Sequence, residues 1–336
     1  MAVSPTSEPL VDGFGRVHRA LRLSVTDRCN LRCRYCMPAE GMDWLPKDQV
    51  LGFDEIERVV RLLARMGVGD IRVTGGEPLV RRDLSTLVGR ITAIDGIREV
   101  SITTNGVLLA DQVDELVAGG LARVNVSVDS LDPERFAAIT RRDDLARVLD
   151  GLAACERHER LRPIKVNAVL LRGLSEPDVL PLAEFARLRP YVVRFIEVMP
   201  LDAPRGWERD SVLSGAEVRA MVEARWPLVA LDRERTSAPG TRWWFADGAG
   251  ELQFVSSVTE SFCASCDRLR LTADGQLRTC LFAETETDLR GPLRDGACDA
   301  EVESIIREAV AAKGPGHGMD RPDWTYTGRP MSLIGG

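Results

Sequence analysis

The sequence of 336 residues contains few histidines and no long apolar run. Its three histidines, His18, His158 and His317, are a poor basis for a metal site or a catalytic triad built mainly on imidazole. No stretch approaches the roughly 20 consecutive apolar residues of a membrane helix. Residues 1–10 also lack the basic and apolar regions of a secretory signal. We therefore expect a cytoplasmic protein without a membrane partner.

An excess of basic residues is absent as well. The formal net charge is −7 at pH 7. A protein that binds duplex nucleic acid usually presents a broad basic face. We therefore predict no nucleic-acid partner, although basic residues can still gather inside a site.

Cysteine, by contrast, is present eight times and is unevenly distributed. In a reducing compartment, clustered cysteines are more often metal ligands than disulfides. Cys155 and Cys298 stand alone, and we predict that both are structural. The other six form two groups, a first triad of Cys29, Cys33 and Cys36 and a second triad of Cys263, Cys266 and Cys280. Any metal in this protein is thus expected to be held mainly by sulfur.

Strand-like and helix-like segments alternate over the first two thirds of the chain, which is typical of an α/β fold with a parallel sheet. The segment 54–66 is amphipathic; Asp54 and Glu57 predict a capping box, and Gly67 predicts its end. Six β–α units are two fewer than a complete barrel. We therefore predict a partial (βα)6 TIM-like barrel, with strands at 21–27, 71–75, 99–105, 122–129, 164–171 and 192–199.

Polar and apolar residues alternate along these strands. Since alternate residues share a face, the apolar face is expected to meet the helices and the polar face to line a lumen. An antiparallel sheet with one wet face is the alternative, and the regular helical spacers disfavour it. Arg22, Arg72 and Lys165 occupy polar positions on three strands. Buried cations are costly unless paired, which predicts either a polyanionic ligand such as a triphosphate or internal salt bridges, for example to Asp129.

The first triad has the spacing C-x3-C-x2-C and directly follows the first predicted strand. Iron–sulfur clusters usually take four cysteines, so three leave one iron open to bind a small ligand and pass an electron to it. A zinc site completed by a distant ligand is the alternative. The second triad admits the same two interpretations, with Cys298 as a candidate fourth zinc ligand, and Asp274-Gly275 within it predicts a hairpin.

A family resemblance rests on the segment 24–38, SVTDRCNLRCRYCMP, which is similar to the cluster motif of the radical S-adenosylmethionine superfamily. The surrounding sequence resembles the GTP 3′,8-cyclase family of molybdenum cofactor biosynthesis, through 74–78 (TGGEP), 81–83, 103–106, 125–131 and the second triad. The resemblance runs from about residue 10 to the end. It implies a barrel core at 10–230 and a region at 231–336 that carries a second cluster, closes the barrel and ends in a Gly335-Gly336 tail reaching the active site.

The resemblance also implies cofactors and contacts. It implies two [4Fe–4S] clusters, a catalytic one on Cys29, Cys33 and Cys36 and an auxiliary one on Cys263, Cys266 and Cys280, each with an open iron. It assigns S-adenosylmethionine contacts to Tyr35, Gly76, Ser127 and Met199. It assigns GTP contacts to Arg22, Arg72, Thr103, Lys165, Arg268, Leu269 and Arg270. One departure is visible, because Asp267 stands where the family usually has asparagine.

The implied reaction is radical conversion of GTP to 3′,8-cyclo-7,8-dihydro-GTP. The implied partners are a cyclic pyranopterin monophosphate synthase that consumes the product, a low-potential electron donor and, as one option, a second copy of the chain in a homodimer. Two rival interpretations stay open at this stage. One is a radical peptide-modifying enzyme, which usually carries more cysteines near its C-terminus. The other is a zinc-binding interaction protein without catalysis.

Overall fold

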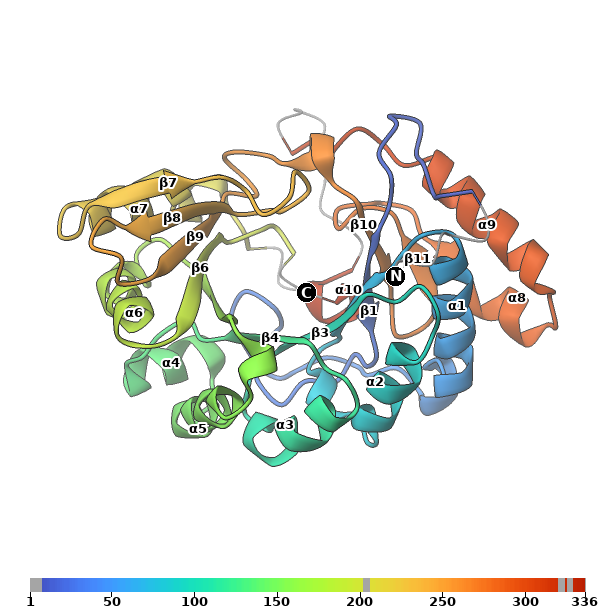
Figure 1. The fold of residues 1–336 in the computed structure, drawn as a ribbon, viewed down its shortest axis with the longest axis horizontal. Helices are drawn as coiled ribbons and strands as arrows, with labels where there is room; N and C mark the ends of the chain where they lie inside the picture. Colours follow the sequence, from blue (N-terminus) through green and yellow to red (C-terminus); the bar gives the residue numbers. More distant parts are fainter. Residues whose placement is uncertain (1–7, 202–205, 320–323, 325–328, 336) are drawn as a thin grey trace.

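The computed structural model describes residues 8–201, 206–319, 324 and 329–335. Its core is an arc of parallel strands, each within a few residues of the predicted position (Figure 1). Neighbours along the arc are hydrogen-bonded in chain order from β1 to β6. The antiparallel alternative is therefore wrong for this part of the sheet. The strands are β1 (Ala20–Ser24), β2 (Asp70–Thr74), β3 (Glu99–Thr104), β4 (Arg123–Ser127), β5 (Ile164–Leu170) and β6 (Tyr191–Glu197).

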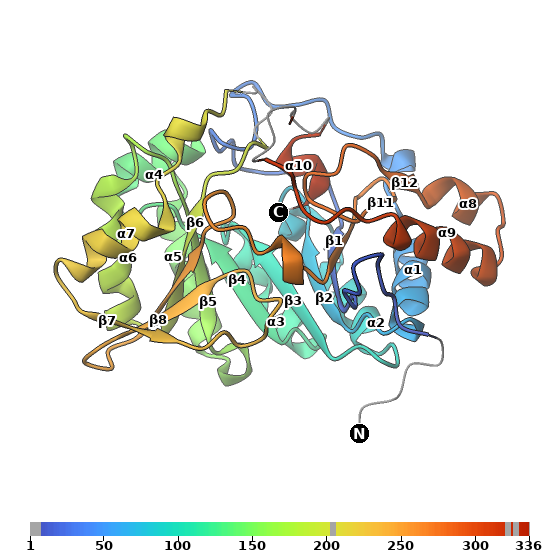
Figure 2. The ribbon, with the colours of Figure 1, turned by 90° about the horizontal axis from the view of Figure 1, so that it is seen from above.

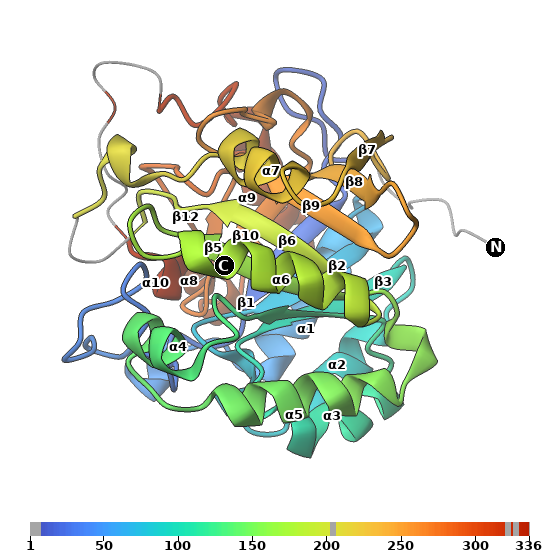
Figure 3. The same ribbon diagram turned by 90° about the vertical axis from the view of Figure 1, so that its left-hand side faces the viewer.

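Helices cover the outer face of this arc, as Figures 1 and 3 show. The predicted alternation of side chains is confirmed in β1, where Leu21 and Leu23 are buried in the main core, whereas Arg22 lines the central cavity. The sheet is thus apolar outside and polar inside. The covering helices are α1 (Phe53–Arg65), α2 (Leu84–Thr92), α3 (Leu109–Ala118), α4 (Pro133–Thr140), α5 (Leu145–Glu156) and α6 (Glu176–Leu188).

Helix α1 shows how one of these elements begins and ends. Its buried face carries Ile56, Val59 and Leu63 at helical spacing. The predicted capping box at Asp54 and Glu57 is wrong. The helix begins at Phe53, and the backbone N–H of Gly52 donates to Glu55 at 2.6 Å. Because the helix begins one residue earlier, Asp54 and Glu57 lie inside it and pair with Arg90 of α2 instead.

The C-terminal third of the chain extends the sheet at both edges. In the described residues the sheet has 12 strands, in the order β12-β11-β10-β1-β2-β3-β4-β5-β6-β9-β8-β7. Strand β10 pairs in parallel with β1, and β9 pairs in parallel with β6. One segment of chain therefore lies beside both ends of the arc. The added strands are β7 (Leu228–Leu231), β8 (Thr241–Phe245), β9 (Glu251–Val255), β10 (Arg268–Leu271), β11 (Gln276–Arg278) and β12 (Thr287–Asp288).

The remaining helices are α7 (Gly215–Glu223), α8 (Arg290–Arg294), α9 (Asp299–Ala311) and α10 (Met331–Ile334). Helix α9 is tied to α1 by ion pairs from Arg58 and Arg65 to Asp299 (Figure 2). Helix α10 lies on the concave side of the arc, near its centre (Figure 1). The predicted hairpin at Asp274-Gly275 is confirmed, since β10 and β11 are antiparallel and Gly275 has φ of 81°. The division of the chain between residues 230 and 231 stays a prediction.

Candidate active site

A large cavity occupies the concave side of the sheet and contains about 1820 Å³ of empty space, part of it open to solvent. All six cysteines of the two triads line it. The first triad follows the carboxyl end of β1, whereas Cys266 immediately precedes β10, whose first residue Arg268 pairs with Ala20 at the start of β1. The two triads therefore lie toward opposite ends of the lumen.

The loop that carries the first triad is held from several sides. Arg141, at the end of α4, donates to the carbonyls of Arg32 at 2.8 Å and Met37 at 3.0 Å. The Asn105 side chain, after β3, donates to Asn30 at 2.7 Å and lies 3.8 Å from the Cys29 sulfur. Burial raises the pKa of Cys29 to about 11 and also raises the pKa of Cys33. These contacts hold the three thiols in place at the cavity wall.

The glycine pair after β2 supports this loop. A Cβ on Gly75 would lie 2.5 Å from the Thr26 carbonyl oxygen, and one on Gly76 would lie 2.4 Å from the carbonyls of Asp27 and Arg28. The Gly76 N–H donates to Thr26 at 2.7 Å. Glycine is needed at both positions because the two backbones approach closely. Gly76 also lines the cavity.

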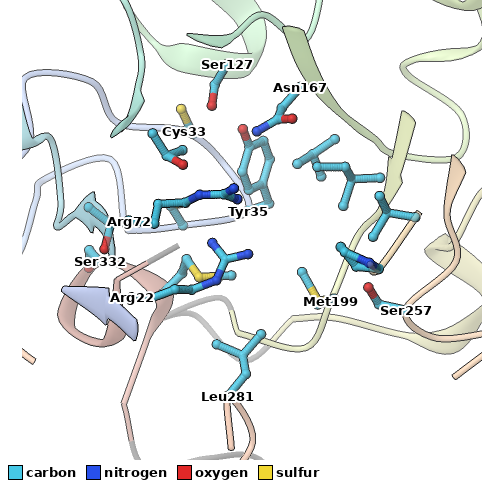
Figure 4. A pocket seen from close by; sticks show the side chains of 18 of the residues that line it. Arg22, Cys33, Tyr35, Arg72, Ser127, Asn167, Met199, Ser257, Leu281 and Ser332 are labelled. Carbon is cyan, nitrogen blue, oxygen red and sulfur yellow. The ribbon is translucent and has the colours of Figure 1, made fainter. Parts of the chain in front are cut away.

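The four predicted S-adenosylmethionine contacts all line the cavity together with the first triad. Figure 4 shows three of them, Tyr35, Ser127 and Met199. The Tyr35 hydroxyl donates to Asp129 at 2.7 Å, and the Val169 N–H donates to the same carboxylate at 2.9 Å. The structure shows these two hydrogen bonds to Asp129 in place of the salt bridge to a lumen cation that the sequence allowed. Gly76, Ser127 and Met199 lie at or just beyond the carboxyl ends of β2, β4 and β6, and all three line the cavity. Their roles as ligand contacts stay predictions.

Arginines from neighbouring strands converge between the two triads. Arg22 is in register with Arg72 on one side and with Arg270 on the other. Figure 4 shows the guanidinium groups of Arg22 and Arg72 pointing into the cavity. Burial and the neighbouring cations lower the pKa of Arg22, and they lower the pKa values of Arg72 and Arg270 to about 9. This cluster of like charges favours an anionic ligand, because an anion would relieve the repulsion.

Sequence reasoning missed Arg194 of β6, which also lines the cavity. It is in register with Asn167 of β5, and both have a buried polar atom, Nε and Oδ1 respectively, without a hydrogen-bond partner among the described residues. Thr103, a predicted contact, has a buried and unpartnered Oγ1 in the same wall. The signal for Arg194 was available, because it is a lone cation inside the apolar run 192–199.

Two predicted GTP contacts are not among the residues that line the cavity. Leu269 is fully buried in the main core, on the face of β10 opposite Arg268 and Arg270. Lys165 is 7% exposed, and its ammonium lies 3.4 Å from a carboxylate oxygen of Glu234. Burial and Arg194 lower the pKa of Lys165 to about 8. Thus Lys165 would need to exchange Glu234 for a phosphate to act as predicted.

The second triad borders the β10–β11 hairpin. Arg268 lines the cavity, and its Nε and Nη2 atoms each lie 3.4 Å from the Cys266 sulfur. Asp267, the departure from the usual asparagine, accepts a hydrogen bond from Ser237 at 2.9 Å and is not among the lining residues. Its other carboxylate oxygen, Oδ1, is buried without a hydrogen-bond partner among the described residues.

The tail reaches the cavity as the resemblance implied. Arg270 donates a hydrogen bond to the Gly335 carbonyl, and Ser332 of α10 lines the cavity. A Cβ on Gly335 would lie 2.6 Å from the Thr74 hydroxyl oxygen, so only glycine fits without displacing that side chain. Gly336, the other half of the predicted tail, lies outside the described residues.

The donor chemistry of both triads fits iron–sulfur clusters. In each triad, all three thiols line the same cavity. Cysteine thiolates are the usual ligands of iron–sulfur clusters, and each thiolate binds a different iron. Three thiols facing one cavity are thus a donor set that a four-iron cluster with one open iron can use.

Comparison with known proteins defines the class. A family model for the radical SAM superfamily matches residues 23–186, and one for Molybdenum Cofactor Synthesis C matches residues 191–319. The solved structure of Streptococcus suis SuiB bound to S-adenosylmethionine is similar in fold, with a TM-score of 0.57 and 15% identity over 88% of this chain and 67% of that chain. This chain is therefore a radical S-adenosylmethionine enzyme.

Curated relatives narrow the class to a family. GTP 3′,8-cyclase of Mycobacterium sp. (strain KMS) is 49% identical over 99% of this chain and 95% of its own length. GTP 3′,8-cyclase 2 of Mycobacterium tuberculosis (strain ATCC 25618 / H37Rv) is 48% identical over 99% and 94%. The chain belongs to the GTP 3′,8-cyclase family. Membership confirms S-adenosylmethionine and [4Fe–4S] clusters as its cofactors and leaves the residues that bind each as predictions.

Among the helices of the described residues, none is both long and apolar enough to span a membrane.

Proposed function

We propose that this enzyme converts GTP to (8S)-3′,8-cyclo-7,8-dihydroguanosine 5′-triphosphate, the first step of molybdenum cofactor biosynthesis. The reduced first cluster, when bound, supplies the electron that cleaves S-adenosylmethionine to methionine and a 5′-deoxyadenosyl radical. The hydrogen atom at C3′ of the ribose is then removed, C3′ bonds to C8 of guanine, and one electron and one proton complete the product. The observation that carries this proposal is one cavity lined by both triads, with cations between them.

The chain's own residues have three tasks in this proposal. Cys29, Cys33 and Cys36 hold the first cluster, and Tyr35, Gly76, Ser127 and Met199 position S-adenosylmethionine beside it. Cys263, Cys266 and Cys280 would hold the second cluster, which would supply a binding point for the guanine base. The triphosphate lies between, where guanidinium groups can pair with phosphate oxygens. The proposed GTP contacts are Arg22, Arg72, Thr103, Lys165, Arg268 and Arg270, with Leu269 limited to its backbone because its side chain is in the core.

Helix α10 and the loops of both triads border the cavity. Holding the ribose in one orientation toward the radical supplies much of the rate, because a correctly oriented reaction avoids the entropy cost of encounter. Enclosure by α10 and the loops of both triads would keep the radical from water and from other hydrogen donors. We further propose a cytoplasmic enzyme that receives electrons from a low-potential donor and passes its product to a cyclic pyranopterin monophosphate synthase. A homodimer is the proposed assembly.

Isotope transfer tests the reaction. With GTP deuterated at C3′ and anaerobically reduced, reconstituted enzyme, we expect deuterium in the 5′-deoxyadenosine, because that atom is the one removed. Mass spectrometry of the 5′-deoxyadenosine measures the transfer. GTP deuterated at C2′ is the control and is expected to give unlabelled 5′-deoxyadenosine. Unlabelled 5′-deoxyadenosine from the C3′-labelled substrate, with product formed, would exclude this mechanism.

The lowered pKa of Lys165 predicts a pH dependence of substrate binding. The ammonium form, which would bind a phosphate, is lost as the pH rises through about 8. We expect the KM for GTP to rise between pH 7 and pH 9 in the unmodified enzyme. Arginine has a higher ordinary pKa than lysine, so a Lys165→Arg variant keeps more of its charge across this range and its KM is expected to rise less. Initial rates at pH 7, 8 and 9 measure both profiles, and parallel profiles would show that Lys165 does not bind GTP.

A further inference from the structure

The charges beside the two triads differ. At the first triad, the buried carboxylates of Glu77 and Asp129 act on Cys29 and Cys33 respectively, and the guanidinium of Arg32 acts on Cys29 with the opposite sign. At the second triad, the guanidinium of Arg268 and the ammonium of Lys313 both act on Cys266. No part of the proposed reaction uses Lys313.

Lys313 follows the end of α9 and is only 4% exposed. Its Nζ lies 3.9 Å from the Cys266 sulfur, and it donates to the carbonyls of Cys266 at 3.3 Å and Arg268 at 3.1 Å. A buried ammonium is costly unless anions or strong acceptors surround it. The acceptors around the Lys313 ammonium are the carbonyl oxygens of Cys266 and Arg268 and the Cys266 sulfur. They belong to the segment that carries the first two cysteines of the second triad.

The segment around Lys313 is pinned to the same loop. Arg16 donates to the Cys263 carbonyl at 2.9 Å and to the carbonyls of Gly314 at 2.6 Å and Pro315 at 2.9 Å. Arg16 is itself held by the buried carboxylate of Asp12 at 2.6 Å. Arg16 therefore joins the segment that follows Lys313 to the loop that carries Cys263 and Cys266.

A fixed positive charge beside a cluster sulfur stabilises the form of the cluster that holds one more electron, because net charge and hydrogen bonds to sulfur set the potential. Carboxylates beside the other cluster have the opposite effect. We propose that Lys313 is a positioning residue that raises the reduction potential of the second cluster above that of the first. The inference rests on the proposed assignment of the cysteine ligands, and not on the identity of the substrate.

The first experiment compares the two clusters. Full-length protein with Cys29, Cys33 and Cys36 replaced by alanine keeps only the second cluster, and the matching variant of Cys263, Cys266 and Cys280 keeps only the first. Each is reconstituted, checked for about four irons per chain and titrated anaerobically with dithionite, without nucleotide or S-adenosylmethionine. Electron paramagnetic resonance follows the one-electron reduction. We expect the second cluster to be reduced at the higher potential; an equal or lower value would overturn the proposal.

The second experiment isolates Lys313 in the protein that keeps only the second cluster. Lys313→Gln is expected to lower the ratio of reduced to oxidised cluster at least tenfold at a fixed potential, a fall of about 59 mV for one electron. Lys313→Arg, which keeps the charge, is expected to restore most of the shift. Arg307→Gln removes one charge from the exposed side of α9 and is expected to change nothing.

These outcomes separate a charge effect from a structural one. If Lys313→Gln binds its full iron and titrates like the parent, Lys313 only supports the loop and the proposal is wrong. If that variant fails to bind iron, the comparison of the two clusters still decides whether the second has the higher potential. Cyclisation of GTP plays no part in either readout, so failure of the proposed function and failure of this inference are distinguishable.

Discussion

Replacing Cys266 with alanine is expected to abolish formation of the cyclised nucleotide while slow cleavage of S-adenosylmethionine continues. The two triads lie toward opposite ends of the cavity, and the loop of the first is held by Gly76, Asn105 and Arg141, none of which belongs to the second. Loss of the second cluster should therefore leave the first able to form. The guanine base would lose its anchor, and misplacement by about 1 Å can cost roughly 100-fold in rate.

Two products distinguish loss of cyclisation from loss of S-adenosylmethionine cleavage. 5′-Deoxyadenosine reports cleavage of S-adenosylmethionine, and the cyclised nucleotide reports turnover; both are quantified by mass spectrometry after anaerobic reaction with GTP. We expect Cys33→Ala to lose both products. Cys298→Ser is the matched control, because Cys298 is exposed and precedes α9, outside the cavity lining. Wild-type amounts of cyclised nucleotide from Cys266→Ala would contradict the assignment of the second cluster.

Replacing Arg194 with glutamine is expected to weaken GTP binding and, at the same time, to stabilise the substrate-free protein. Arg194 is buried, and burial together with Arg268 and Arg123 lowers its pKa to about 10, even though Glu234 favours its charge. A hydrogen bond to a charged group contributes about 1.5–3 kcal/mol, so its loss should raise the KM for GTP roughly 10- to 100-fold. Without an anion in place, the same guanidinium repels its neighbours.

The two effects are measured separately. Initial rates against GTP concentration give KM, and thermal melts of the protein without GTP give the change in stability. Arg172→Gln is the control, because Arg172 is exposed, pairs with Glu217 and does not line the cavity. An unchanged KM would exclude Arg194 from the substrate site. A lower melting temperature for the substrate-free Arg194→Gln protein would contradict the view that the cations are stabilised mainly by the ligand.

Local sequence patterns were sufficient to predict features that depend only on residues close together in the chain. Arg22 and Arg72 were placed in the lumen because strand side chains alternate between faces. The hairpin at Asp274-Gly275 followed from turn chemistry. The start of α1 was misplaced by one residue, because Glu55 and Glu57 are both acidic and the contact of Gly52 with Glu55 depends on where the preceding loop enters the helix.

Other features depend on contacts between distant segments, and local patterns do not contain them. Lys165 was expected among the GTP contacts, yet it pairs with Glu234, a residue from the connection between β7 and β8. The role of Gly76 in packing against the loop before Cys29 was likewise invisible until the two backbones were placed together. Lys313 drew no attention in the sequence, because nothing within its own segment links it to Cys266.

By itself, the sequence determined the chemistry: two groups of three cysteines in a chain of alternating strands and helices, with cations at lumen positions. These properties follow from residue types and short spacings. Only the tertiary structure decided that the triads share one cavity, that Arg194 joins the cation cluster, and that carboxylates lie near the first triad while Lys313 and Arg268 lie beside Cys266. The physical reason is the pairing of β10 with β1, which brings the end of the chain beside its beginning and sets which charges each cluster meets.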